Sequence, residues 1–234
     1  MSDSDPGLTL GRAAEAYERG RPDWPEELLD AVPVPPASDV LDLGAGTGKL
    51  TRLLATRHRV LALEPDEAMR TALRGVEVLA GAAEAIPLQD DSVDAVFTAE
   101  AFHWFDAPRA LREIARVLRP RGVVAVLWNR AEPGRRVLPE GVLPEAAPGH
   151  RAVYEDLRAA FEGAPFEPLR EVLFPREQEV SRAAMLDFFS SISPVTALPP
   201  RERRAVLDRV AAALDRPSYR RRWTVMLYWT RLAG

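Results

Sequence analysis

The sequence has no cysteine, a single lysine and no long apolar run, and each shortage narrows what the protein can be. Without cysteine, disulfides and thiolate metal sites are both excluded, which is compatible with a reducing compartment. The longest apolar run, at 123–128, is far too short to cross a bilayer, and residues 1–7 lack the basic-then-apolar layout of a signal peptide. We therefore expect a cytoplasmic protein that has no contact with a membrane.

Length and composition are ordinary for one large α/β domain: 234 residues, 47% hydrophobic and 28% charged. The net charge of -4 is unevenly divided, because residues 201–234 hold nine arginines and three acidic residues (+6), which leaves -10 for residues 1–200. An acidic body argues against wide nucleic-acid binding. The arginines near the end either contact an anionic substrate or partner, or form a solvated helix face opposite an apolar stripe. They include Arg201, Arg203, Arg204, Arg220, Arg221 and Arg222, and the stripe is Leu207, Val210 and Leu214.

Short β-rich apolar runs alternate with amphipathic segments over the first 130 residues. The runs are continuous, which is typical of strands covered on both faces; they lie at 40–44, 59–64, 76–81, 93–100 and 123–129. Asp66 and Asp106 stand at N-cap positions of the helical segments that follow them. This rhythm predicts right-handed crossovers and a parallel sheet. Further helices are expected at 151–161, 181–191 and 200–214, and strands near 169–174 and at 223–229.

The glycine-rich turn in VLDLGAGTGKL is the most informative stretch. Gly44, Gly46 and Gly48 leave a strand and enter a helix, where small residues let the backbone approach a ligand. Glu64 ends the second strand, where its carboxylate can accept hydrogen bonds from both ribose hydroxyls. A dinucleotide fingerprint would have glycine at position 49, which is lysine, and Asp42 suits an ammonium group better than a pyrophosphate. The turn predicts a ligand with ribose, adenine and an amino-acid end; the alternative is that these glycines only make a tight turn.

The combination of motifs resembles the class I S-adenosylmethionine-dependent methyltransferases. The similarity is to the small-molecule branch that includes ubiquinone/menaquinone-biosynthesis enzymes and trans-aconitate methyltransferases, and it covers residues 13–130. The motifs are YERGRPDWP, VLDLGAGTGKL, LALEPDEAM, GAAEAIPLQDDSVDAVFTAEAFHWFD and EIARVLRPRGVVAVLWN. The resemblance implies a Rossmann-like, doubly wound α/β fold with a seven-stranded, mostly parallel sheet whose last strand is antiparallel. Residues 1–36 would form an N-terminal helical lid, and residues 37–234 the cofactor-binding domain with substrate-side insertions in 130–220.

The resemblance also implies a set of residues that bind the cofactor, S-adenosyl-L-methionine. Glu64 would bind the ribose, and Arg21 in the lid would be a partner for the carboxylate of the cofactor. The whole set is Tyr17, Arg21, Asp42, Gly44, Ala45, Gly46, Glu64, Pro65, Ala83, Glu84 and Ala99. The chain departs from its relatives in two places. Ala82 stands where many carry an aspartate for the adenine amino group, and Trp24-Pro25 replaces Tyr-Pro at the end of the lid motif.

The aromatic stretch AFHWFD follows the fourth strand and predicts a wall of the acceptor pocket. Its aromatic rings would exclude water around the sulfonium, or else pack in the core under the lid. His103 would take a proton from the acceptor, orient the acceptor as a donor, or be structural. Glu100 would bind an amine or cap a turn. The expected pocket comprises Trp24, Glu100, Phe102, His103, Trp104, Trp128 and Asn129.

The leading hypothesis is methyl transfer to an O, N or C nucleophile of a small molecule. The alternatives are a nicotinamide-dependent oxidoreductase, disfavoured because the single lysine, Lys49, leaves no Tyr-x-x-x-Lys pair, and a non-catalytic cofactor-binding regulatory protein. His58 and His150 have no partners at ligand spacing, so no metal site is expected. The acceptor, and whether the protein is a monomer or a homodimer, are left open by the sequence.

Overall fold

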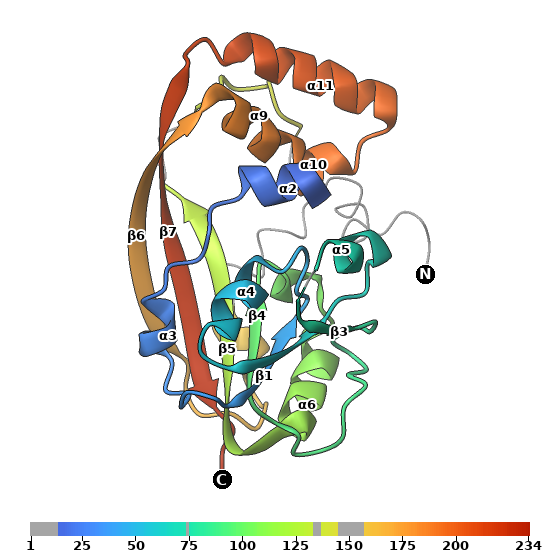
Figure 1. Cartoon of the computed structure of the whole chain (residues 1–234), viewed down its shortest axis with the longest axis vertical. Coiled ribbons are helices and arrows are strands. Elements are labelled where there is room, and N and C mark those ends of the chain that lie inside the picture. Colours follow the sequence, from blue (N-terminus) through green and yellow to red (C-terminus); the bar gives the residue numbers. More distant parts are fainter. Residues whose placement is uncertain (1–13, 74, 133–136, 145–156) are drawn as a thin grey trace.

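The computed structural model describes residues 14–73, 75–132, 137–144 and 157–234. Within these residues, seven strands form one sheet in the order β3-β2-β1-β4-β5-β7-β6 (Figure 1). The strands are β1 (Asp39–Leu43), β2 (Arg59–Leu63), β3 (Glu77–Leu79), β4 (Val93–Ala99), β5 (Leu118–Ala131), β6 (Arg170–Ser181) and β7 (Ser218–Arg231). Strands β1 to β5 run parallel, and β7 is antiparallel to both of its neighbours. The predicted mostly parallel sheet with an antiparallel last strand is confirmed.

The helices follow the expected alternation with the strands. They are α2 (Ala14–Gly20), α3 (Leu28–Ala31), α4 (Lys49–Ala55), α5 (Glu67–Ala72), η2 (Phe102–Trp104), α6 (Ala107–Val117), α8 (Leu157–Ala160), α9 (Arg182–Ser190), α10 (Ser193–Thr196) and α11 (Pro200–Ala213). Both predicted N-caps are present, because Asp66 accepts from Met69 N at 3.0 Å and Asp106 from Arg109 N at 3.3 Å. Of the helix expected at 151–161, residues 151–156 lie outside the described residues.

Two apolar layers cover the sheet, one on each face. On one face α3 and α4 pack on side chains such as Phe97 and Leu127. On the other face α6 and α8 pack on side chains such as Val124 and Trp128. Strands buried on both sides have no polar face, which explains the continuous apolar runs in the sequence. Because β1, β2, β4 and β5 run parallel, their carboxyl ends lie at one edge of the sheet.

A cap lies above that edge, where β6 and β7 extend beyond the parallel strands (Figure 1). We define the cap as α9, α10, α11 and the adjoining ends of β6 and β7. It has its own apolar cluster, which includes Met185, Phe189 and Val210. Helix α2 packs against α9 so closely that a Cβ on Gly20 would lie 2.3 Å from the backbone nitrogen of Phe188. Glycine therefore allows this contact.

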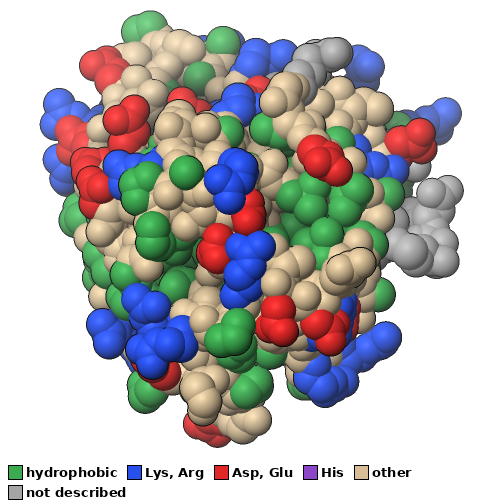
Figure 2. Space-filling view, turned by 60° about the horizontal axis from the view of Figure 1, so that its bottom comes forward, with side chains coloured by type: hydrophobic (Ala, Val, Ile, Leu, Met, Phe, Trp, Pro, Cys, Tyr) green, Lys and Arg blue, Asp and Glu red, His purple; other side chains and the backbone are tan. Residues whose placement is uncertain are grey.

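Arg220, Arg221 and Arg222 lie in β7, so placing them on a helix face was wrong. A strand sends successive side chains to opposite faces. Arg220 and Arg222 accordingly share one partner, Glu177 of β6, and Arg221 points the other way. On the face of the molecule shown in Figure 2, acidic and basic side chains are interspersed.

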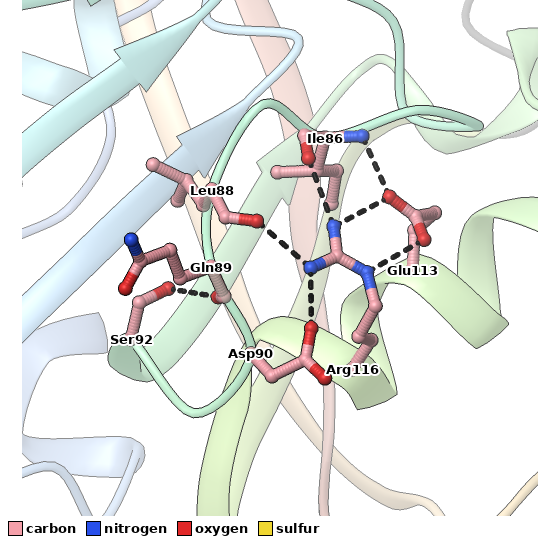
Figure 3. A network of polar contacts seen from close by, with 7 residues as sticks. All are labelled: Ile86, Leu88, Gln89, Asp90, Ser92, Glu113 and Arg116. Carbon is pink, nitrogen blue, oxygen red and sulfur yellow. Dashed lines mark hydrogen bonds and ion pairs between the residues drawn. The ribbon is translucent and has the colours of Figure 1, made fainter.

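Arg116 of α6 fixes the connection between β3 and β4 (Figure 3). Its guanidinium donates to the carbonyls of Ile86 and Leu88 at 2.9 and 2.8 Å and pairs with Asp90 and Glu113. Glu113 in turn accepts from Ile86 N at 2.8 Å. The network ties the segment that follows residues 81–84 to a helix, so those residues are held in place at the edge of the sheet.

Candidate functional site

The glycine turn adopts the backbone that its sequence predicts. Gly44, Gly46 and Gly48 have φ values of +73°, +58° and +87°, a region that glycine occupies without steric cost. A Cβ on Gly44 would lie 2.6 Å from the Cβ of Ala101, whereas one on Gly46 would meet nothing within 4 Å. The turn is therefore pressed against the end of β4 at its first glycine and is open at its second.

Glu64 is held rigidly beside this turn. Its Oε2 accepts from Gly46 N at 2.8 Å, and its Oε1 accepts from Asp66 N at 2.9 Å. The side chain is buried, and burial raises the pKa of its carboxyl despite the two backbone donors. Each carboxylate oxygen retains acceptor capacity, since a carboxylate offers about four lone-pair sites.

Asp42 lies in β1, two residues before the first glycine, and is 1% exposed. Thr51 Oγ1 donates to its Oδ2 at 2.6 Å, while Oδ1 is buried with no hydrogen-bond partner. Burial raises the pKa of this carboxyl to about 7. A buried acceptor without a partner costs free energy, so the site suits a ligand that brings a donor.

A cavity of about 390 Å³ joins these groups. Among the predicted site residues it is lined by Tyr17, Arg21, Trp24, Asp42, Gly44, Ala45, Gly46, Glu64, Pro65, Ala83, Glu84, Ala99, Glu100, Trp104 and Asn129. Phe105, one of the aromatic rings expected to wall the pocket, also lines it, as do Thr47, Lys49, Leu50, Met69 and Ala82, which were outside the predicted set of site residues. Thr47, Lys49 and Leu50 belong to the glycine motif itself, so their position beside the turn was the available signal.

Helix α2 and the loop that follows it are fastened to the glycine turn and α4 by polar and charged side chains. Glu18 of α2 accepts from Thr47 Oγ1 at 2.7 Å and pairs with Arg52 of α4. Lys49 Nζ lies 2.7 Å from Asp23 Oδ1. Tyr17 of α2 lines the cavity, and burial raises its pKa to about 12. The cavity is thus closed on this side by α2 and the loop that follows it.

Glu100 occupies a strained position at the end of β4. Its φ is +53°, which is uncommon for a residue with a Cβ and is often found at functional sites. Its Oε1 accepts from Asn129 N at 2.7 Å, and burial raises the pKa of its carboxyl. The Oδ1 atom of Asn129 is buried without a partner. This end of the cavity therefore presents hydrogen-bond acceptors.

Two of the predicted pocket residues are core residues instead. Phe102 is 0% exposed and stacks on Phe161 with centroids 5.8 Å apart, and Trp128 is 1% exposed and packs on Tyr228. Neither lines the cavity, so placing them in the pocket was wrong. The one-turn helix η2 buries Phe102 in the core, whereas the consecutive rings of Trp104 and Phe105 line the cavity.

His103 is also absent from the cavity lining. Its Nδ1 accepts from Trp128 Nε1 at 3.4 Å. In the neutral imidazole that this contact requires, the basic nitrogen is the one already engaged with the indole. His103 is therefore poorly placed to take a proton from an acceptor in the cavity, and a structural contact with Trp128 accounts for its position.

The described residues offer no group of three or more His, Cys, Asp or Glu side chains arranged to hold a metal ion. His58 is buried, which lowers its pKa, and His150 lies outside the described residues. None of the described helices has the length and apolarity needed to cross a membrane.

Comparisons with known proteins agree on one family. Residues 41–126 match the family described as methyltransferase domain. An uncharacterized methyltransferase of Schizosaccharomyces pombe is 34% identical over 225 residues, which is 90% of each chain. An uncharacterized methyltransferase of Mycobacterium tuberculosis is 50% identical over 130 residues, and the match spans about half of that protein (54%) and of this chain (53%). A solved structure from Anaeromyxobacter dehalogenans, assigned as a type II methyltransferase, has a TM-score of 0.61 at 27% identity over 92% of this chain and 99% of that one.

Proposed function

The chain belongs to the class I S-adenosylmethionine-dependent methyltransferases, and from that premise we propose that it transfers a methyl group to an O, N or C nucleophile of a small molecule. The observation that supports this most directly is the pair of buried carboxylates, Asp42 and Glu64, which line one cavity together with the glycine turn. A nicotinamide-dependent oxidoreductase is set aside by the family.

The residues around the turn fit the proposed cofactor. The remaining lone pairs of Glu64 would accept from the ribose hydroxyls, since its two oxygens are already fixed by backbone donors. The unpartnered Oδ1 of Asp42 would accept from the ammonium group, directly or through water. Ala82, Ala83 and Glu84 line the cavity and would surround the adenine, which would then depend on backbone and apolar contacts. Arg21 would pair with a carboxylate of the ligand.

Once bound, S-adenosylmethionine would supply an electrophilic methyl group on a sulfonium. The protein then has to align the acceptor and exclude water. Tyr17 and Trp24 from the lid and Trp104 and Phe105 after β4 would do this as rigid walls of the cavity.

Glu100 replaces His103 in the proposal as the group that takes a proton. It lines the cavity, whereas His103 does not. Burial raises the pKa of its carboxyl toward the range in which a base works best near neutral pH. The unpartnered Oδ1 of Asn129 beside it would accept a hydrogen bond from the nucleophile of the methyl acceptor. An O–H or N–H nucleophile can donate to both Glu100 and Asn129.

The lid division and the cellular setting are also part of the proposal. Residues 1–36 would act as the lid on a core formed by 37–234, and the protein would act in the cytoplasm on a small-molecule acceptor, with neither a nucleic acid nor a membrane as partner. Limited proteolysis with and without S-adenosylhomocysteine tests the lid, because a lid that closes on the ligand should become more resistant to cleavage. Gel filtration decides between monomer and homodimer.

Calorimetry tests the cofactor assignment. We expect binding of S-adenosylmethionine and S-adenosylhomocysteine and none of NAD. Glu64→Gln should weaken binding, while Glu77→Gln, on exposed strand β3, serves as a control of the same chemistry. A screen of acceptors that detects the mass of one added methylene then separates an enzyme from a non-catalytic cofactor-binding protein.

A further inference from the structure

Two arginines above the cavity contact the same aromatic ring. Arg21 follows lid helix α2, Arg221 lies in β7, and Phe188 belongs to α9 of the cap. The guanidinium carbon of Arg221 is 3.8 Å from the centroid of the Phe188 ring, and that of Arg21 is 5.1 Å from it. Three segments far apart in sequence therefore bring two positive charges together.

Neither guanidinium has a carboxylate partner among the described residues. Arg221 Nη1 donates to Gly20 O at 3.2 Å, and the Nε of Arg21 is buried with no hydrogen-bond partner. None of the ion pairs formed among the described residues includes Arg21 or Arg221. Both side chains are half-buried, and the Nε atom of Arg21 is wholly enclosed. A partly desolvated cation without a counter-ion is unfavourable, so this arrangement favours a bound anion.

The neighbouring arginines of β7 and α2 sharpen the point. Arg220 and Arg222 pair with Glu177, and Arg19 pairs with Asp187 at 2.8 Å. These side chains are on the outside, where pairing adds little to stability. The chain thus provides carboxylates for these neighbouring arginines, whereas the half-buried Arg21 and Arg221 have none among the described residues.

Glu100 is an acidic group close enough for the charges of Arg21 and Arg221 to act on its carboxylate, but that carboxylate already accepts a backbone hydrogen bond. Its Oε1 accepts from Asn129 N at 2.7 Å, and it lies within 4 Å of neither guanidinium. Burial, and then the charge of Arg21, lower the pKa of Arg221 to about 10. Tyr17, the other ionisable group here, stays neutral because burial raises its pKa to about 12. Arg221 therefore experiences the positive charge of Arg21 as well as the negative charge of Glu100.

A third donor adjoins the pair. Trp223 is 6% exposed, and its Nε1 is buried with no hydrogen-bond partner. The guanidinium of Arg221 lies over its ring, 5.5 Å from the centroid. Arg21, Arg221 and Trp223 all bring N–H donors and no acceptors. Groups of donors alone match a ligand group with several oxygen acceptors and a negative charge.

We propose that Arg21, Arg221 and Trp223 form a binding site for an anionic group of the methyl acceptor, a carboxylate or a phosphate monoester. This inference rests on the proposed function and narrows its substrate class. The anion anchors the acceptor under the cap, and its nucleophile reaches toward Glu100 and the glycine turn. Arg21 lines the cofactor cavity, so a carboxylate of the cofactor shares its charge, while Arg221 and Trp223 are left for the acceptor.

The test is calorimetric titration of the full chain saturated with S-adenosylhomocysteine. The probes are acetate, benzoate, succinate and phenyl phosphate, with benzamide as the neutral match of benzoate. We expect at least one anion to bind, benzamide not to bind, and added sodium chloride to weaken the binding. Absence of binding by all the anions, or equal binding of benzoate and benzamide, overturns the proposal.

Two substitutions in one strand form a matched pair. Arg221→Gln should lower the affinity for the anion by about ten- to hundredfold, because charge-assisted hydrogen bonds are lost. Arg220→Gln removes the same charge one residue away, on the outside, and should leave the affinity unchanged. Arg221→Lys, which keeps the charge, should retain part of the binding. If Arg221→Gln binds the anion as tightly as the wild type, Arg221 only fastens Gly20 and the proposal fails.

A second ligand separates the two possible sources of the anion. 5′-Methylthioadenosine has the adenosyl part of the cofactor without its carboxylate. If the anions bind when either nucleoside ligand is present, the site serves the acceptor. If they bind beside 5′-methylthioadenosine and not beside S-adenosylhomocysteine, the cofactor carboxylate fills the site and the proposal is wrong. Failure of S-adenosylhomocysteine itself to bind would instead contradict the proposed function.

Discussion

Arg116 and the Arg21–Arg221 pair are arginines in very different surroundings. Arg116 has two carbonyls and two carboxylates around one guanidinium, and these contacts raise its pKa (Figure 3). Arg21 and Arg221 stack on Phe188 instead, and within the described parts of the chain neither guanidinium pairs with a carboxylate; Arg221 donates to the carbonyl of Gly20. The first arrangement is complete as it stands, whereas the second has donors to spare.

The difference indicates which region was shaped for stability and which for a ligand. Native structures rarely leave buried polar atoms without partners. Among the described residues six side-chain atoms are in that state, and three of them belong to residues that line the cavity: Arg21, Asp42 and Asn129. Two of these atoms are hydrogen-bond acceptors and one is a donor, so the cavity suits a ligand that carries both hydrogen-bond donors and acceptors.

The largest expected effect concerns Glu100, which lines the cavity and forms no ion pair with either arginine. Glu100→Gln should lower the turnover of any O–H or N–H acceptor by about 10²- to 10⁴-fold, the usual contribution of a general base. The affinity for S-adenosylhomocysteine should stay near the wild-type value. His103→Ala is the matched comparison and should leave turnover within about threefold. Single-turnover kinetics at saturating acceptor measure both; an unaltered rate in Glu100→Gln would remove Glu100 from the mechanism.

The next largest expected effect is the loss of stability when Arg116, whose guanidinium is fully hydrogen-bonded, is replaced. Arg116→Ala leaves Glu113 and the carbonyls of Ile86 and Leu88 without their donor, which should lower the free energy of unfolding by about 2–3 kcal/mol. Arg112, one turn earlier on the same helix, is exposed and has no such network, so Arg112→Ala should cost less than about 0.5 kcal/mol. Urea denaturation measures both. Equal losses would mean that the network in Figure 3 adds nothing to stability.

A smaller effect is expected where the arginine has no partner. Arg21→Met keeps an apolar stem against Tyr17 and Phe188 and removes a charge that lacks a counter-ion, so the free energy of unfolding should change by less than about 1 kcal/mol. S-adenosylhomocysteine should bind more weakly to this variant. A loss of stability as large as that of Arg116→Ala would show that Arg21 is a structural residue, and the contrast between the two regions would disappear.

Much of the fold was predictable because local pattern and tertiary role coincide in the first 130 residues. Continuous apolar runs mark strands buried on both faces, and Asp66 and Asp106 cap helices by contacts within three residues. The cavity-lining positions of Asp42, the glycine turn and Glu64 follow from the same local order, because strand ends of a parallel sheet meet at one edge.

The acceptor side was less predictable because it depends on contacts between distant segments. Nothing local tells which rings of AFHWFD turn inward, and Phe102 and Trp128 are buried by partners such as Phe161 and Tyr228. The role of Arg221 was hidden in a run of three arginines that looked like a helix face. Strand alternation separates it from Arg220 and Arg222, but that requires knowing that residues 218–231 form a strand paired with β6.

The finest contrast between the two regions is a dependence on pH, which arises from Asp42. Burial raises the pKa of Asp42 to about 7 in the folded protein, so the ligand-free protein binds a proton there that the unfolded chain loses near pH 4. This contribution to stability is present at low pH and is lost as the pH rises from about 4 through 7.

The affinity for the ligand should show the opposite trend with pH. An ammonium group prefers the ionised carboxylate, so the affinity for S-adenosylhomocysteine should rise by about tenfold between pH 6 and 8. Asp42→Asn, with Thr51 left in place, should flatten both curves, whereas Arg112→Ala should leave them unchanged. Calorimetry and thermal unfolding across this range measure the two trends. An affinity that is independent of pH in the wild type would separate Asp42 from the ammonium group.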